Sequence, residues 1–192
     1  MRITAGEYRS RLIRSPRGVP IRPTADRVKQ ALFNILGKVI IDRSVLDLFG
    51  GTGNLGLEAI SRGAASCVFI DNNVRCIDAI KYNVESLKLP QSVKTEVILQ
   101  DAFWYIREVA KKGLQFGLIF LDPPYHKELI KKSLILLDNY NIITPSSYVI
   151  AEHYRKDDLP ADEELKNLEL CRQEKYGSTI LSFYRTRRKS EA

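Results

Sequence analysis

The chain has 192 residues, of which 44% are hydrophobic and 28% are charged, and its net charge is +7. These values are ordinary for a water-soluble globular protein with a substantial core, and we expect a single such fold. No apolar run approaches the roughly 20 residues that span a bilayer, and the first residues lack the apolar core of a secretion signal. Three cysteines without C-x-x-C spacing and only two histidines predict reduced structural thiols, a cytoplasmic protein and no metal.

Most of the positive charge lies near the N-terminus. Residues 1–30 contain eight basic and two acidic side chains. Such a segment favours a phosphate-bearing partner, although a basic face that only keeps the protein soluble is an alternative. Residues 1–23 are punctuated by glycine and proline, which predicts a hairpin-like arm outside the main sheet.

Strands and helices alternate after this arm. Thr24 is predicted to cap a helix over 25–36. Strands are predicted at 45–49, 67–70, 95–99, 116–121 and 148–152, with helices over 54–62, 74–87, 102–111 and 127–137 between them. Two late strands, 168–174 and 179–184, flank a turn at 176–178. The alternation predicts an α/β fold with a doubly wound, mostly parallel sheet, and the late strands predict an antiparallel insertion at one edge.

A glycine-rich loop follows the first of these strands. Gly51, Gly53 and Gly56 match the G-x-G-x-x-G pattern of nucleotide-binding turns, although a simple tight turn is the alternative reading. Asp47 precedes the loop, where its carboxylate would repel a pyrophosphate. The same carboxylate can interact with an ammonium group, directly or through water. S-adenosylmethionine carries an ammonium and a sulfonium and has no phosphate, so it fits the loop better than a dinucleotide.

Acidic residues also end the next strands. Asp71 is placed to accept hydrogen bonds from ribose hydroxyls. Asp101 is placed to accept from the adenine amino group, the Ala102 N–H could donate to the ring, and Phe103 could pack near it. Each acid alone could be an ordinary turn or cap, but their order along the chain predicts a cofactor site. The predicted cofactor-binding residues are Asp47, Gly50, Gly51, Thr52, Gly53, Asp71, Asn72, Asp101, Ala102 and Phe103.

The segment Asp122-Pro123-Pro124-Tyr125 follows the apolar strand 116–121. The Asp122 carboxylate and the Pro123 carbonyl can accept hydrogen bonds from an exocyclic amine, and Tyr125 can stack on a base. The prolines remove two N–H donors, so that the turn presents acceptors. A plain strand-ending turn is the alternative. These four residues are the predicted catalytic residues, and they indicate methyl transfer to a base amine.

With these residues together, the chain resembles the class I S-adenosylmethionine-dependent methyltransferases, and more narrowly the RsmD family, the 16S rRNA (guanine(966)-N2)-methyltransferases. The family usually has Ala at Gly51, often Ser at Thr52 and often Glu at Asp71. The resemblance covers nearly the whole chain, and its marks are Ala5-Gly6-Glu7-Tyr8-Arg9, Arg22-Pro23-Thr24, Asp26-Arg27, Ala31-Leu32-Phe33-Asn34, Leu46-Asp47-Leu48-Phe49, Gly53, Leu55-Gly56-Leu57-Glu58-Ala59, Ser61-Arg62-Gly63-Ala64, Asp122-Pro123-Pro124-Tyr125 and Tyr176-Gly177-Ser178-Thr179.

The resemblance implies a Rossmann-like seven-stranded sheet with an antiparallel last strand, and a methyltransferase domain over 24–192. It implies methylation of a guanine N2 amine in 16S rRNA, within an assembled small-subunit particle, by a monomer that needs no metal and no membrane. N6-methylation of adenine in DNA or other RNA is the main alternative, followed by a nucleotide-binding oxidoreductase and a non-enzymatic RNA-binding module. Within the basic arm, the predicted RNA-binding residues are Tyr8, Arg9, Arg11 and Arg22, the last of which could instead brace the cofactor loop.

Overall fold

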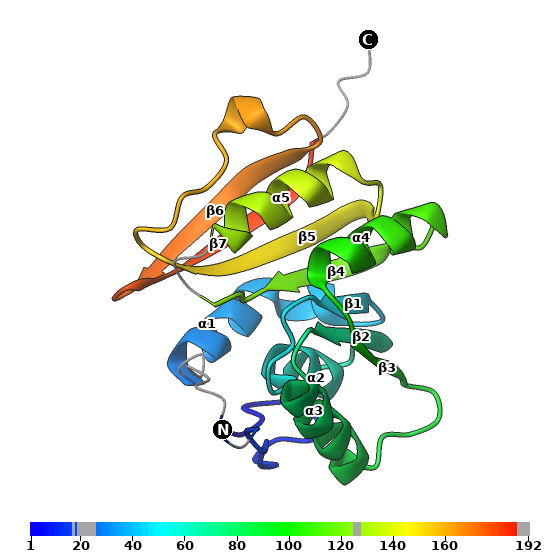
Figure 1. Cartoon of the computed structure of the whole chain (residues 1–192). Coiled ribbons are helices and arrows are strands. Elements are labelled where there is room, and N and C mark those ends of the chain that lie inside the picture. Colours follow the sequence, from blue (N-terminus) through cyan, green and yellow to red (C-terminus); the bar gives the residue numbers. More distant parts are fainter. Residues whose placement is uncertain (17, 19–25, 125–127, 188–192) are drawn as a thin grey trace. The chain divides into compact units, whose positions relative to one another are not determined.

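The computed structural model describes residues 1–16, 18, 26–124 and 128–187. Its seven strands form a mixed sheet in the order β3-β2-β1-β4-β5-β7-β6, with helices between the strands along the chain (Figure 1). This confirms the predicted α/β fold. None of the helices in the described ranges is long and apolar enough to span a membrane.

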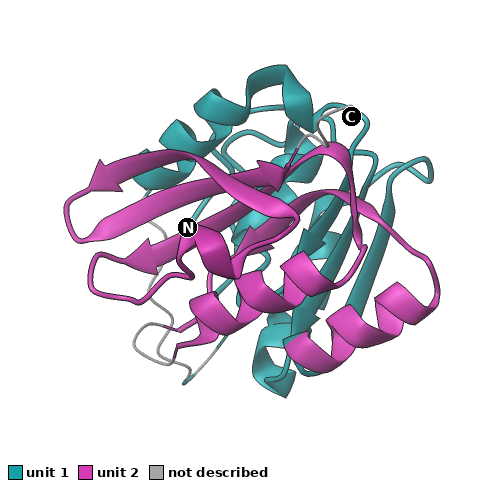
Figure 2. Ribbon diagram, turned by 90° about the horizontal axis from the view of Figure 1, so that it is seen from above, with its two compact units in different colours: residues 1–102 teal, residues 103–192 magenta. Residues whose placement is uncertain are grey.

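The chain divides into two compact units, residues 1–102 and 103–192, which Figure 2 distinguishes by colour. In the first unit, three parallel strands pair so that Asp47 lies opposite Phe69 and Asp71 opposite Leu99. The carboxyl ends of these strands therefore lie at the same edge. The elements are α1 (Asp26–Leu36), η1 (Gly37–Ile40), β1 (Ser44–Asp47), α2 (Asn54–Ser61), β2 (Ser66–Asp71), α3 (Val74–Leu87) and β3 (Lys94–Leu99).

Helix α3 begins and ends where the sequence predicts. The Asn73 side chain caps its N-terminus by accepting a hydrogen bond from the Arg75 N–H at 3.0 Å. Lys88 closes the helix in the left-handed conformation, with φ 52°. Its apolar face buries Ile77 and Ile80, among others.

In the second unit, α4 and α5 lie on the same face of the β4–β5 strands (Figure 1). β4 is buried along its whole length and pairs in parallel with β5, while β7 is antiparallel to both β5 and β6. The predicted antiparallel insertion is therefore confirmed. The elements are α4 (Ala102–Lys111), β4 (Phe116–Leu121), α5 (Leu129–Asn139), β5 (Ile143–Tyr154), η2 (Asp162–Glu164), β6 (Leu168–Tyr176) and β7 (Thr179–Thr186).

Strand β5 starts earlier than its sequence predicts. Residues 144–147 read as a loop because they are Thr-Pro-Ser-Ser, and Ser146 has a φ of 62°. They nevertheless extend the strand past an irregularity between Phe116 and Leu118. The hydroxyls of Thr144 and Ser147 donate to the Phe116 carbonyl at 3.4 and 3.3 Å. Side-chain hydroxyls thus bond to the backbone where the pairing with β4 is irregular.

The N-terminal segment forms a short antiparallel pair within the first unit. Arg2 bridges Leu12, and the Ile3 N–H donates to the Arg11 carbonyl at 3.0 Å. Gly6 has a φ of 84°, and an added Cβ would lie 1.8 Å from the Ser61 carbonyl oxygen. Only glycine permits this close approach, which seats the segment against the end of α2.

Candidate functional site

The glycine loop sits between β1 and α2, as the sequence predicts. Gly51 and Gly53 have φ values of 56° and 76°, in the left-handed region that favours glycine. A Cβ at Gly56 would lie 2.3 Å from the Phe69 ring and 2.6 Å from the Cys67 sulfur. The last glycine of the motif therefore lets α2 rest directly on β2.

Asp47 caps the helix that follows this loop. Its Oδ2 accepts a hydrogen bond from the Gly56 N–H, in the first turn of α2, at 3.0 Å. Gly53, at the N-cap position, has no side chain that could do so. The motif alone does not predict this role, although the lack of a capping side chain at Gly53 signals that another group must supply the acceptor.

The same carboxyl group is buried, with 2% of Asp47 exposed. Burial raises the pKa of Asp47 to about 7; the Gly56 N–H opposes the rise and the charge of Asp71 adds to it. A positively charged ligand group beside Asp47 would favour its ionised form. The residue is therefore suited to an ammonium and unsuited to a phosphate.

Asp71 links the loop to the end of β2. Its Oδ2 accepts from the Gly51 N–H and its Oδ1 from the Asn73 N–H, both at 2.8 Å. A carboxylate has about four lone-pair sites, so two backbone donors orient Asp71 and leave acceptor capacity. Asp71 is half-buried. The Cys76 thiol is a third hydrogen-bond partner of this carboxylate, and the acceptor capacity that remains suits a ligand hydroxyl while Asp71 keeps its contact with the loop.

These contacts separate two classes of cofactor. A dinucleotide site uses the free N–H groups of a helix N-terminus to hold a pyrophosphate. Here the Gly56 N–H is taken by the Asp47 carboxyl group, whose ionised form places a negative charge at the helix end. The residues therefore fit S-adenosylmethionine, which brings an ammonium, a sulfonium and a ribose diol, better than they fit a dinucleotide.

The other predicted cofactor residues of the first unit lie on the loop or at strand ends. Thr52 is buried, and its carbonyl accepts from the Asn83 side chain at 2.9 Å. Asn72 is exposed after β2. Asp101 is exposed after β3, and Ala102 is buried.

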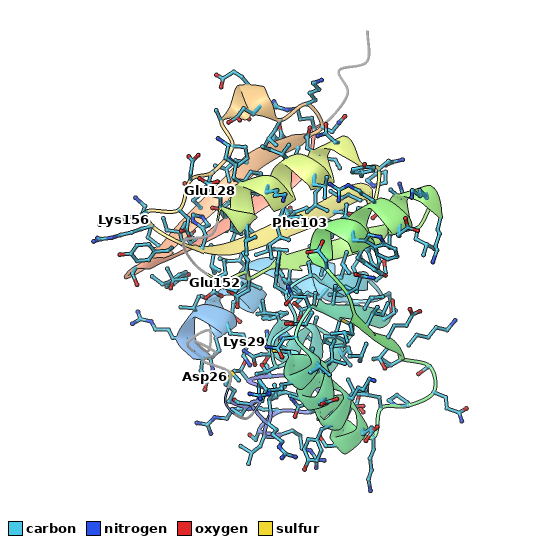
Figure 3. The ribbon with its side chains drawn as sticks, viewed as in Figure 1. Asp26, Lys29, Phe103, Glu128, Glu152 and Lys156 are labelled. Atoms are coloured by element: carbon cyan, nitrogen blue, oxygen red, sulfur yellow. The ribbon has the colours of Figure 1, made fainter. Side chains whose placement is uncertain are left out.

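Two of the predicted site segments belong to the second unit. Phe103 lies in α4 (Figure 3), and the Lys132 ammonium sits 4.4 Å from the centre of its ring. At the end of β4, Asp122 is half-buried, Pro123 is buried and Pro124 is exposed. Tyr125, like Arg22 and Thr24, lies outside the described residues. Within the described ranges, no group of three or more His, Cys, Asp or Glu residues could hold a metal ion.

A buried ionic cluster, for which the sequence has no local pattern, holds the N-terminal segment in place. Glu58 forms ion pairs with Lys29 at 3.0 Å and Arg62 at 2.8 Å. It also accepts from the N–H groups of Thr4 and Ala5 and from the Thr4 hydroxyl. Burial alone would raise the pKa of Glu58, but these hydrogen bonds and positive charges lower it.

This cluster connects three elements of the first unit. Lys29 comes from α1 (Figure 3), and it also donates to the Arg2 carbonyl and to Asn54 Oδ1. The start of the N-terminal segment is therefore anchored by the core. Arg9 and Arg11 beyond it are exposed, and Tyr8 is half-buried.

The sheet order and the strand-end carboxylates define a class I methyltransferase fold. The family model described as Conserved hypothetical protein 95 matches residues 1–185, and the chain belongs to this family, the RsmD family of methyltransferases that its sequence resembles.

Relatives match over nearly the whole chain. YlbH of Bacillus subtilis (strain 168) is 36% identical, over 97% of this chain and all of its own length. Ribosomal RNA small subunit methyltransferase D of Escherichia coli (strain K12) is 30% identical, over all of this chain and 93% of its own. The solved structure of yhhF from Escherichia coli has a TM-score of 0.81 at 30% identity, covering 98% of this chain and 99% of that one.

Proposed function

We propose that this protein transfers a methyl group from S-adenosylmethionine to the exocyclic N2 amine of a guanine in 16S rRNA. The observation that carries the cofactor is the hydrogen bond between Gly56 and the buried Asp47 carboxyl, which suits a cationic ligand and disfavours pyrophosphate. The substrate class rests on relatives from Escherichia coli and Haemophilus influenzae that are named Ribosomal RNA small subunit methyltransferase D.

On this proposal, the first unit binds the cofactor through groups that its own backbone orients. Asp71 accepts from the ribose hydroxyls while Gly51 and Asn73 hold it in place. Asp47 interacts with the ammonium, directly or through water. Asp101 accepts a hydrogen bond from the adenine amino group, and the Ala102 N–H donates to the adenine ring. When bound, S-adenosylmethionine supplies the electrophilic methyl group on its sulfonium.

The target amine is a poor nucleophile because its lone pair is delocalised into the base. The Asp122 carboxylate and the Pro123 carbonyl accept hydrogen bonds from its two N–H groups, which stabilises the positive charge that develops as the nitrogen gains a carbon. Tyr125 is the residue that we propose to stack on the target base. A base in a helix would first have to leave its stack, so a loop nucleotide or a flipped one is the substrate.

The basic arm is proposed to dock RNA phosphates. Arg9 and Arg11 are exposed, and the Arg11 side chain donates to the Ser86 carbonyl at 2.7 Å, which holds it near the end of α3. Tyr8 is a candidate stacking residue, and Arg22 completes the set. The Glu58 cluster anchors the start of the arm that carries these side chains.

The test is transfer of labelled methyl groups to three acceptors: purified 16S rRNA, small-subunit particles and DNA. Digestion to nucleosides then identifies the methylated base. We expect N2-methylguanine in the RNA or the particles. N6-methyladenine would favour the adenine alternative, which Asp-Pro-Pro can also serve, and no transfer to any of the acceptors would refute the proposal.

One substitution tests the assignment of the amine acceptor. Asp122→Ala should abolish methyl transfer while S-adenosylmethionine binding, followed by calorimetry, largely survives. The matched control is Asp158→Ala, which removes an exposed carboxylate of the same unit, 3.1 Å from the Lys131 ammonium. If Asp122→Ala kept the activity of the control, the assignment would be wrong.

A further inference from the structure

A groove in the first unit is lined by the N-terminal segment and α3. Its volume is about 560 Å³, which is large enough for a nucleotide. One wall comes from the N-terminal segment and includes Arg14 and Gly18. The other wall comes from α3 and includes Arg75, Asp78 and Tyr82. No role in the cofactor site has been assigned to these residues.

The helix wall presents its side chains at helical spacing. Arg75, Asp78 and Tyr82 are three and four residues apart in succession, so they lie along one face of α3. All three are exposed, and 51% of Tyr82 is accessible. The face therefore offers a cation, a hydrogen-bond acceptor and an aromatic ring in a row.

The opposite wall adds a second cation to the ring. The Arg14 guanidinium lies 4.8 Å from the centre of the Tyr82 ring. Aromatic rings and guanidinium planes both stack on the flat face of an unstacked base. Here the guanidinium lies over one face of the ring, so a base would stack on the outer side of the pair. This pair gives the groove a stacking site of the kind that recognises single-stranded nucleic acid.

The backbone of Arg14 in the first wall is held in position. The Asn83 side chain is buried and bonds to both the N–H and the carbonyl of Arg14, at 2.9 and 3.0 Å. Gly18 has a φ of 68°, and a Cβ there would lie 3.1 Å from Arg75 Nη1. Gly18 thus lies close to the Arg75 guanidinium, and the hydrogen bonds of Asn83 fix the backbone of Arg14.

Holding the N-terminal segment on α3 explains only part of the arrangement of side chains at this groove. The contact of Arg14 with Tyr82 would help to hold the N-terminal segment on α3. However, Asn83 already fixes that segment through the Arg14 backbone. Bracing the segment also does not explain a second exposed arginine, Arg75, at the same groove.

We propose that this groove binds one unpaired nucleotide of the RNA substrate, at a position other than the methylated base. The base stacks on the outer side of the Tyr82–Arg14 pair, and Arg75 binds a phosphate. Asp78 accepts a hydrogen bond from a base amine or a ribose hydroxyl, and its negative charge disfavours a bare phosphate ion. This inference rests on the proposed function, since it takes RNA as the substrate.

The test measures the affinity of the full-length protein for a short, unstructured, fluorescently labelled RNA at several salt concentrations. Tyr82→Ala should weaken binding by about 5- to 150-fold, the range for loss of one stacked base. The salt slope, which is the slope of the logarithm of affinity against the logarithm of salt concentration, should not change. Tyr82→Phe keeps the ring and should bind like the wild type. Arg75→Ala should lower the salt slope by about 0.7, as for one lost phosphate contact on a single strand.

Lys81→Ala is the matched control, because Lys81 is an exposed cation of the same helix that does not line the groove. It should leave the salt slope unchanged. If Tyr82→Ala and Arg75→Ala bound RNA no differently from Lys81→Ala, the groove would not be an RNA site. A free mononucleotide that displaced the RNA at equal concentration would also overturn the inference, because the site would then recognise small nucleotides.

Methylation assays keep this inference distinct from the proposed function. With rRNA or particles as substrate, Tyr82→Ala should raise KM and leave kcat and S-adenosylmethionine affinity unchanged. A wild-type enzyme that methylates rRNA, with a Tyr82→Ala variant of equal KM, would overturn the groove alone. A wild type that neither binds nor methylates RNA would overturn both proposals.

Discussion

Replacing Asp47 with Asn should change how the stability of the protein depends on pH. The pKa of Asp47 rises from an ordinary value of 3.8 to about 7 because the group is buried. In the unfolded chain the same group loses its proton near the ordinary value. Between about pH 4 and pH 7 the folded state therefore binds more protons, so the free energy of unfolding falls as the pH rises through this window and levels off above it.

The size of the effect follows from the shift. Each pKa unit corresponds to about 1.4 kcal/mol, so a shift of about three units amounts to roughly 4 kcal/mol at most. Asn keeps the size of Asp47 and an oxygen that can accept from the Gly56 N–H, but it cannot ionise. The stability of Asp47→Asn relative to the wild type should therefore increase from about pH 4 to pH 7 and then stay constant.

Urea unfolding followed by circular dichroism across this pH range measures the difference directly. Asp42→Asn is the control, because it replaces an exposed carboxylate of the same unit in a left-handed position that Asn tolerates. If the free energies of unfolding of the wild type and Asp47→Asn changed in parallel across this pH range, the reasoning would be refuted. S-adenosylmethionine binding should also release a proton below about pH 7, which calorimetry in buffers of different ionisation heat detects.

Two further predictions concern the basic segment and its anchor. Glu58→Gln should cost about 3–5 kcal/mol of unfolding free energy because it leaves the buried Lys29 ammonium without its anion. Glu108→Gln breaks a more exposed ion pair, with Lys111, and should cost less than about 1 kcal/mol; equal losses in urea unfolding would contradict the role of burial. The Arg9/Arg11→Ala double variant should lower the salt slope of RNA binding by about 0.7–0.9 per lost contact, and an unchanged slope would exclude docking by these residues.

Much of the fold can be predicted from residues that are neighbours in the chain. Helix α3 has its boundaries where the sequence predicts because its cap, Asn73, and its apolar spacing lie within the helix and next to it. The strand β4 could be predicted because its six successive residues have no polar side chain and can all be buried. The parallel sheet and the glycine loop follow from the alternation of such segments and from residues adjacent in the chain.

The tertiary structure decided what the charged residues contact. Asp47 is a predicted ligand for an ammonium, yet in the fold it also caps α2, because Gly53 offers no side chain to the first turn. Glu58 bonds to Thr4, 54 residues earlier in the chain. No local pattern encodes such a contact, since the free energy of burying a charge depends on which distant groups the fold brings beside it.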